Sequence, residues 1–301
     1  MSKIGLKKSL LITASILVAV VLVLRDSAPK ELPSILKLTP PQGSQAGLLQ
    51  VPIVSYERAS ASNGTERVDF IGAVHLGEPA YYADLNKRFK GYDRVLFELV
   101  ADHGRVEQLE GPNQDSMLGA FQRAFSQLLG LTFQLDEINY GAPNFVHADL
   151  SPTQLAQAMT ARGESFATLL LKLLRFSFDP KVRDDLKRAG YEEPQLDGIN
   201  PVLIALRGPT PKERARIKLF FAQGLASSDV IMKYLEGENG ISLIDDRNIA
   251  ALDVLRQQLK AGQKHLGIFY GVGHLPDMHE RLTQQLGFKI VEIEWVTAWM
   301  L

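Results

Sequence analysis

Two histidines lie in closely similar turns near opposite ends of this 301-residue chain. Residues 72–76 read GAVHL and residues 271–275 read GVGHL, so His75 and His274 occupy equivalent places. Neutral imidazole binds divalent metal ions and acts as a general base near neutral pH. A lone histidine is better explained by helix capping or by packing beneath a loop, whereas two in matching contexts favour a functional site.

Two charged residues are candidates to complete this site. Glu98 lies inside the apolar run VLFEL, where a carboxylate needs a partner because burying an isolated charge is costly. It is therefore either a metal ligand or base, or a member of an ion pair. Arg247 lies in the run IDDRN at an expected helix start, and it can either stabilise a developing anion or pair with a carboxylate.

The remaining polar candidates have simpler structural explanations. His147 and Asp149 stand between a short expected strand and an expected helix start, where Asp149 or Ser151 would cap the helix. We therefore favour structural roles for them over direct catalytic ones. For Asp245 and Asp246, capping of the Arg247 helix is as good an explanation as a functional role. The weak candidates are three isolated histidines: His103, His265 and His279.

The first histidine lies in a unit made of a strand, a loop, a helix and a second strand. Runs rich in β-branched and aromatic residues predict antiparallel strands at 49–58 and 67–73, joined by a turn at Asn63-Gly64. A helix is expected over 79–90 and an apolar strand over 94–100.

The second histidine lies in a C-terminal unit that repeats this plan. The predicted order is a strand at 265–270, a loop at 271–274, a helix at 276–286 and a closing strand at 289–296. Ligands bind at the carboxyl ends of strands in open α/β sheets. If the two opening strands are neighbours, about 4.8 Å apart, His75 and His274 would reach one metal ion or one substrate.

The segment between the two units, about 104–237, is predicted to be a largely helical insertion. The apolar run at 166–178 contains Lys172 and Arg175 and is too short to span a membrane. The predicted fold class is α/β, with two strand-helix-strand repeats forming a mixed, partly parallel sheet. Helices are expected in the insertion and after it at 116–131, 166–178, 212–224 and 245–262.

The N-terminal region predicts a single-pass membrane anchor. Three lysines precede an uncharged run at 9–24 that ends at Arg25, and no small-residue cleavage pattern follows it. We therefore expect an uncleaved signal anchor at 1–25, with the body outside the cytoplasm, on the periplasmic side if the protein is bacterial. A Pro-, Ser- and Gly-rich spacer is expected at 26–47 and one catalytic domain at 48–301.

Composition excludes several functional classes. A net charge of -1 offers no basic surface for nucleic acid. The absence of cysteine excludes disulfides, thiolate metal sites and cysteine nucleophiles, so any metal must be bound through nitrogen and oxygen. The chain has no G-x-S-x-G, H-E-x-x-H or G-x-x-x-x-G-K motif, which argues against the common serine hydrolases, zincins and P-loop proteins.

The paired G-x-x-H turns, the FELV segment, the Asp-Arg-Asn helix start and the terminal YGVGHLPDM resemble the TraB/PrgY/GumN family. This family is related to the Tiki proteases and to the erythromycin esterase/ChaN-like superfamily. The resemblance spans about 67–296 and implies an α/β fold of two repeats, with metal-dependent peptidase activity in the Tiki branch. Asp277 stands where the family's last motif often has glycine. The residues that fall on the family's functional positions are His75, Glu98, Arg247 and His274.

Together these features predict a membrane-anchored hydrolase, metal-dependent and peptidase-like, that acts on a peptide outside the cytoplasm. His75, Glu98 and His274 would hold a divalent ion such as Mn, Co or Zn, and Arg247 would stabilise the oxyanion. A metal-independent esterase-type hydrolase that uses one histidine as general base is an alternative. A second alternative is a non-enzymatic protein that binds a peptide or haem.

Overall fold

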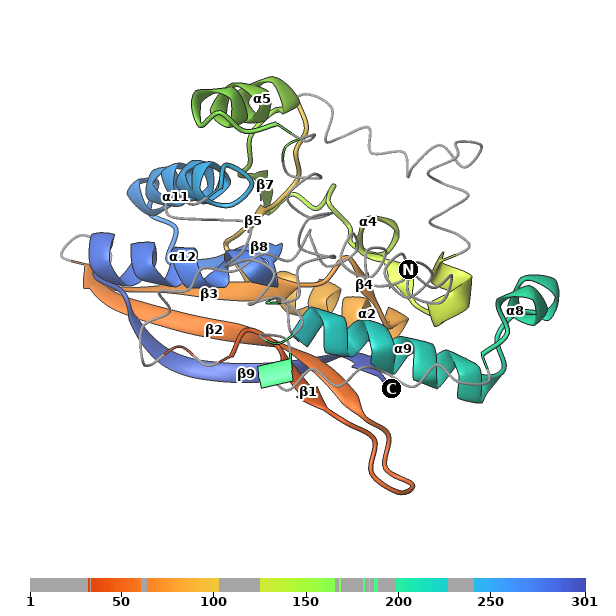
Figure 1. The fold of residues 1–301 in the computed structure, drawn as a ribbon. Coiled ribbons are helices and arrows are strands. Elements are labelled where there is room, and N and C mark those ends of the chain that lie inside the picture. The colour runs from red at the N-terminus through yellow and green to blue at the C-terminus, as the bar shows by residue number, and fades with distance from the viewer. Residues whose placement is uncertain are drawn as a thin grey trace.

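The central sheet is antiparallel on one side and parallel on the other (Figure 1). The computed structural model describes residues 32, 34–60, 64–102, 125–165, 199–226 and 241–301, with isolated positions between 168 and 188. A short β4–β6 pair lies apart from the main sheet. The strands are β1 (Lys37–Thr39), β2 (Leu48–Ser60), β3 (Gly64–Ala73), β4 (Leu76–Gly77), β5 (Arg94–Phe97), β6 (Thr132–Phe133), β7 (Phe145–His147), β8 (His265–Gly271) and β9 (Lys289–Met300).

The main sheet has the order β1-β2-β3-β8-β5-β7, and β9 pairs with the other edge of β2. The β3–β8, β8–β5 and β5–β7 pairs are parallel. Strands β8 and β5 and the carboxyl-terminal half of β3 are mostly apolar and buried, as expected for parallel strands that are covered on both faces. The carboxyl ends of these three strands therefore meet at one edge of the sheet.

Helices pack around the sheet, and local sequence explains where several of them begin. Helix α2 has Pro79 in its first turn, and α5 begins with a capping box formed by Ser151 and Gln154. In Figure 1, α5, α11 and α12 gather around β8, β5 and β7. The helices are α2 (Pro79–Phe89), α4 (Gln134–Glu137), α5 (Pro152–Ala161), α8 (Pro201–Arg207), α9 (Pro211–Ala226), α11 (Asp245–Lys260), the 3₁₀ turn η2 (Val272–His274), α12 (Leu275–Glu280) and the π turn η3 (Arg281–Gln285).

The predicted mixed, partly parallel α/β sheet is confirmed. The strands predicted at 49–58 and 67–73 form the antiparallel β2–β3 hairpin, in which Gly64 has a φ of +77°. The opening strands β3 and β8 are neighbours, with Ala73 opposite Gly271. This adjacency brings the two histidine turns to the same edge.

The two units nevertheless differ in where their closing strands go. Strand β5 pairs with β8 in parallel, whereas β9 turns away and pairs with β2 in antiparallel fashion. The glutamates of β9, Glu292 and Glu294, consequently bind Arg67 and Arg88 and not the histidine turns. The sequence repeat therefore does not produce two equivalent halves.

The insertion at 104–237, expected to be largely helical, also contains strand β7, which joins the main sheet beside β5. Two boundary predictions were wrong. The spacer at 26–47 contains β1, which pairs with β2. Strand β5 ends at Phe97, so Glu98 stands just beyond the strand that was expected over 94–100.

Several predictions fall on residues outside the described part of the chain. They include the anchor at 1–25, the run at 166–178 apart from one position, and most of the helix expected at 116–131. Among the described residues, no helix is long and apolar enough to cross a membrane.

A buried carboxylate on β3 ties together the strands that carry the histidine turns. Asp69 accepts hydrogen bonds from Arg67 Nε at 3.0 Å, Tyr92 Oη at 2.8 Å and His265 Nε2 at 3.2 Å. Burial alone would raise the pKa of Asp69, but hydrogen bonds from His265, Ser55 and Tyr92 and the charge of Arg67 lower it below its usual value. The ionised carboxylate thus stabilises the β3–β8 pairing.

Replacing this carboxylate tests that conclusion. Asp69→Asn should lower the free energy of unfolding by about 1.5–3 kcal/mol near pH 7, because it removes hydrogen bonds to a charged group. The native pKa lies below the unfolded value of about 3.9, so the contribution is complete above that pH and is lost as pH falls through the native pKa. Denaturant unfolding at neutral and acidic pH should show the difference shrinking in acid.

Asp253→Asn is the matched control, because Asp253 makes an exposed pair with Arg256 at 2.8 Å. Exposed pairs contribute at most about 1 kcal/mol. A loss for Asp69→Asn that stays constant from neutral pH to about pH 2 would contradict a role for the ionised carboxylate.

Candidate functional site

The four residues predicted to form the site lie together at the carboxyl ends of β3, β8 and β5. His75 follows β3, His274 ends η2 directly after β8, and Glu98 follows β5. Arg247 reaches them from the first turn of α11. Charges on Glu98, Arg247 and His274 all act on the pKa of His75, which places the four groups in one electrostatic cluster.

The turn that carries His75 is held by hydrogen bonds to its carbonyl groups. Tyr81 donates to Gly72 O at 3.0 Å and Tyr82 donates to Val74 O at 2.8 Å. Gly72 itself allows close packing, since a Cβ there would lie 2.9 Å from Pro52 O and 3.0 Å from a Val272 side-chain carbon. The backbone around His75 is therefore well fixed.

Glu98 is buried and bonded through both carboxylate oxygens. Its Oε1 lies 2.7 Å from Arg247 Nη2, and its Oε2 accepts a hydrogen bond from Gly271 N at 2.5 Å. Burial alone would raise the pKa of Glu98, but the charge of Arg247, with smaller electrostatic contributions from His274 and His75, lowers it well below its usual range. Glu98 is thus an ion-pair member, one of its two predicted roles, and it is ionised near neutral pH.

Arg247 is shared between two carboxylates. In addition to Glu98, it donates to Asp149 from Nε at 2.9 Å and from Nη2 at 2.5 Å. Arg247 is 8% exposed and Asp149 is 3% exposed, so the three side chains form a buried cluster with a formal charge of -1. Pairing with a carboxylate, one of the two predicted roles of Arg247, is the one that the contacts support.

Each of the two histidines has a buried ring nitrogen without a hydrogen-bond partner. His75 Nε2 and His274 Nε2 are both inaccessible to solvent and unpaired. His274 Nε2 lies 3.6 Å from Glu98 Oε1, beyond hydrogen-bonding distance. Because buried polar atoms are nearly always satisfied in proteins, two orphaned nitrogens on histidines of one electrostatic cluster indicate a place for a ligand.

The protonation state of His75 suits ligand binding. Burial lowers its pKa, and the charges of Arg247 and His274 lower it further, while Glu98 opposes them. His75 is therefore neutral near pH 7, and a neutral imidazole has a lone pair on one ring nitrogen. That state is the one required of a metal ligand or a general base.

Three site residues were missed or undervalued from sequence. Asp149 binds Arg247, and Asn248 Oδ1 lies 2.7 Å from His274 Nδ1. Asp277 accepts from Asn248 Nδ2 at 2.8 Å. Asp149 follows a short strand and Asn248 follows Arg247, but neither position by itself indicates which partner lies across the sheet.

The other candidates take structural places. Ser151, and not Asp149, caps α5, and the residue at the cap position of α11 is Ile244. His265 contacts Asp69 at the amino end of β8, and His103 lies outside the described residues. His147 Nε2 lies 2.5 Å from Leu99 O, and His279 Nδ1 lies 3.0 Å from Tyr56 Oη.

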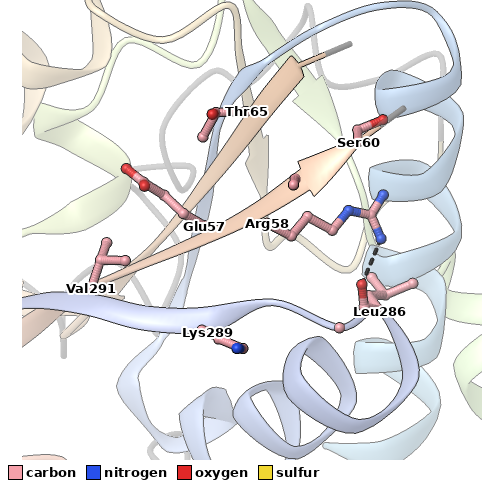
Figure 2. Close-up of a pocket in the computed structure, with 9 residues that line it drawn as sticks. Glu57, Arg58, Ser60, Thr65, Leu286, Lys289 and Val291 are labelled. Carbon is pink, nitrogen blue, oxygen red and sulfur yellow. Dashed lines mark hydrogen bonds between the residues drawn. The ribbon is translucent and has the colours of Figure 1, made fainter. Parts of the chain in front are cut away.

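A pocket of about 620 Å³ lies away from these residues, beside the start of β3 (Figure 2). Thr65 and Lys289 help to line it, and Arg58 donates to Leu286 O at 2.6 Å across it. Since His75 follows the opposite end of β3, this pocket does not belong to the candidate site.

In the described residues no group of three His, Asp or Glu side chains is arranged to hold a metal ion. Comparison with family models, with curated proteins and with solved structures gives no match to this chain. The likeness to the TraB/PrgY/GumN family therefore rests on the motifs alone and stays a prediction.

Replacing Arg247 tests whether its ion pairs with Glu98 and Asp149 stabilise the site. Arg247→Met leaves Glu98 and Asp149 buried without a counter-charge, so we expect the free energy of unfolding to fall by about 3–5 kcal/mol near pH 7. Without Arg247 the pKa of Glu98 should rise, and the carboxyl group should become neutral more readily in acid. The loss should therefore be smaller near pH 4 than near pH 7 when unfolding is followed with denaturant.

Arg256→Met on the same helix is the control, because Arg256 pairs with exposed Asp253. Its effect should stay below about 1 kcal/mol at both pH values. Equal losses for the two variants would show that the Arg247 cluster does not organise this region.

Proposed function

We propose that this protein is a hydrolase whose site is formed by His75, His274, Glu98 and Arg247. The observation that supports the proposal is that two histidines of one electrostatic cluster each have a buried, unpartnered Nε2, and that the Nε2 of His274 lies 3.6 Å from Glu98 Oε1. Imidazoles and an ionised carboxylate at the carboxyl ends of parallel strands are typical components of a hydrolytic centre.

We propose a divalent metal ion from the chemistry of the donor set and not from its arrangement, because the described side chains do not form a metal-binding group. His75, His274 and Glu98 offer two imidazole nitrogens and carboxylate oxygen, the ligands that suit Zn, Mn and Co. The buried formal charge of Glu98, Asp149 and Arg247 also favours a cation. When bound, such an ion acts as a Lewis acid that polarises a carbonyl group and activates water.

The chain's own groups would have separate tasks in this reaction. His75 and His274 would bind through Nε2, and Glu98 would bind through carboxylate oxygen or accept a proton from the attacking water. Arg247 keeps Glu98 ionised and oriented, and Asp149 holds Arg247. The second contact of Glu98, with Gly271 N, restricts its rotation.

One observation favours a metal-independent mechanism as the second candidate. Both oxygens of Glu98 are already bonded, to Arg247 and to Gly271 N. In that case one unpartnered imidazole would act as general base on water, and Glu98 would serve as its charged neighbour. Bound metal in the purified protein separates the two mechanisms.

The substrate and the location follow from the sequence. We propose a peptide substrate outside the cytoplasm, with the chain held to the membrane by residues 1–25. The peptide is inferred from the resemblance to the Tiki branch, and the orientation from the three lysines that precede the apolar run.

The experiment that tests the function compares wild type with Glu98→Gln and His75→Gln. The purified full chain should contain Mn, Co or Zn, cleave fluorogenic peptides and lose cleavage with a chelator. Both variants should lose metal or at least about 100-fold in rate, since loss of a direct ligand exceeds the roughly 10–100-fold effect of more distant partners. His265→Gln, which alters a histidine at the other end of β8, should keep its metal and its rate.

The alternatives predict different results. Hydrolysis of peptides or p-nitrophenyl esters without bound metal would favour the metal-independent mechanism. A Glu98→Gln variant with unchanged metal content and a much lower melting temperature would remove Glu98 from the site. Together with absence of turnover, that result would favour a binding protein.

Membrane topology can be tested separately. A reporter fused after Leu301 should be active outside the cytoplasm, and the intact protein should fractionate with membranes because the uncharged run at 9–24 anchors it. Deleting residues 1–25 should keep the reporter in the cytoplasm. Recovery of a soluble, N-terminally shortened protein from wild type would contradict an uncleaved anchor.

A further inference from the structure

Asn248 lies at the first turn of α11, next to Arg247, and its side chain is completely buried. Its amide contacts three groups. Asn248 Nδ2 lies 2.8 Å from Asp277 Oδ2 and 3.3 Å from His274 O, while Oδ1 lies 2.7 Å from His274 Nδ1. The amide thus bridges the imidazole and the first turn of α12.

The contacts of Asn248 settle which way its amide faces. Asp277 Oδ2 also accepts from Arg281 Nε at 2.6 Å, and an ionised carboxylate only accepts hydrogen bonds. The carbonyl oxygen of His274 likewise only accepts. The amide NH₂ group must therefore face Asp277 and His274 O, because the opposite orientation would set oxygen against oxygen twice.

This orientation determines the hydrogen position on His274. Asn248 Oδ1 can only accept a hydrogen bond, so His274 Nδ1 must carry a hydrogen and donate it to Oδ1. In a neutral ring the lone pair is then on Nε2, the atom that is buried, unpartnered and 3.6 Å from Glu98 Oε1. Tyr270 supports this ring from the side, with ring centroids 5.1 Å apart and an interplanar angle of 80°.

We propose that Asn248 is a positioning residue that holds His274 in the Nδ1–H tautomer and so directs the Nε2 lone pair into the site. Asp277 and Arg281 fix the amide that does this. The consequence for activity rests on the proposed function, whereas the tautomer itself does not. The proposal also gives a role to Asp277, the residue at which this sequence departs from the motif it resembles.

A merely structural role for Asn248 makes a different prediction. Filling space or holding α11 against α12 would affect stability but would leave the histidine tautomer unchanged. The tautomer can be observed directly, because protonated and unprotonated ring nitrogens have well-separated ¹⁵N chemical shifts. Selective ¹⁵N-histidine labelling of the metal-free full chain gives this readout, with His274→Gln used to assign the signals.

The measurement should be made at about pH 8, above the usual histidine pKa of about 6.5. Wild-type His274 should show a protonated Nδ1 and an unprotonated Nε2. Asn248→Ala should lose this preference and, in zinc titrations, bind Zn²⁺ about 10–100-fold more weakly. Asp277→Ala, which keeps Asn248 but frees its amide to rotate, should give a mixture of tautomers.

Asn144→Ala is the matched control. The Asn144 amide donates to Phe89 O at 2.8 Å and Tyr92 O at 3.1 Å, away from the histidines, so its loss should leave the His274 tautomer and zinc affinity unchanged. Wild-type His274 with the hydrogen on Nε2 would overturn the proposal, whether or not the variants fold. An unchanged tautomer in folded Asn248→Ala would also overturn it.

The same data keep the two proposals distinct. Wild type that binds no metal and cleaves no substrate would refute the proposed function, while an Nδ1–H tautomer that depends on Asn248 would still establish the positioning role. Conversely, an active metalloenzyme whose His274 tautomer ignores Asn248 would refute the positioning role alone.

Discussion

The buried guanidinium of Arg247 is the group on which the arrangement of the site depends. It joins Glu98 at the end of β5 to Asp149 after β7, and it does so from α11. Removing such a cation leaves two buried charges unpaired, whereas an apolar cluster of similar volume can be equally stable. The cluster is therefore an inefficient way to build a core. The unpartnered Nε2 of His274, 3.6 Å from Glu98, supports a chemical role for it.

Sheet topology explains why only one glutamate takes part. Strand β8 lies between β3 and β5, so the histidine turns and Glu98 meet at one edge. The closing strand of the second unit, β9, pairs with β2 and carries its glutamates to surface arginines. Two similar segments thus yield two similar histidines but a single carboxylate, and the crossing of β9 to β2 is the cause.

Sequence predicted the local parts of this arrangement better than the long-range ones. The hairpin and α2 follow from turn residues and Pro79. The adjacency of β3 and β8 was only the condition under which the two histidines would converge, and the structure meets it. A short strand before Asp149 was expected, but its three residues do not indicate that β7 pairs with β5, and the partner of Asp149 lies 98 positions away. Helix capping was the local explanation for Asp149, and a buried ion pair formed by folding replaced it.

The two histidines, equivalent in sequence, differ in what surrounds them. The turn around His75 is held through backbone carbonyls by Tyr81 and Tyr82, whereas the His274 ring is held through its own Nδ1 by Asn248. Hydrogen bonds to backbone carbonyls fix the position of the Cα atom, but only a contact to the imidazole ring determines which ring nitrogen carries the hydrogen. Because Nε2 of His274 faces the carboxylate of Glu98, the hydrogen position decides whether this nitrogen can donate to Glu98 or bind a ligand. The amide of Asn248 favours the state in which Nε2 of His274 can bind a ligand. Asn248 itself lies outside the glycine-histidine turn motif.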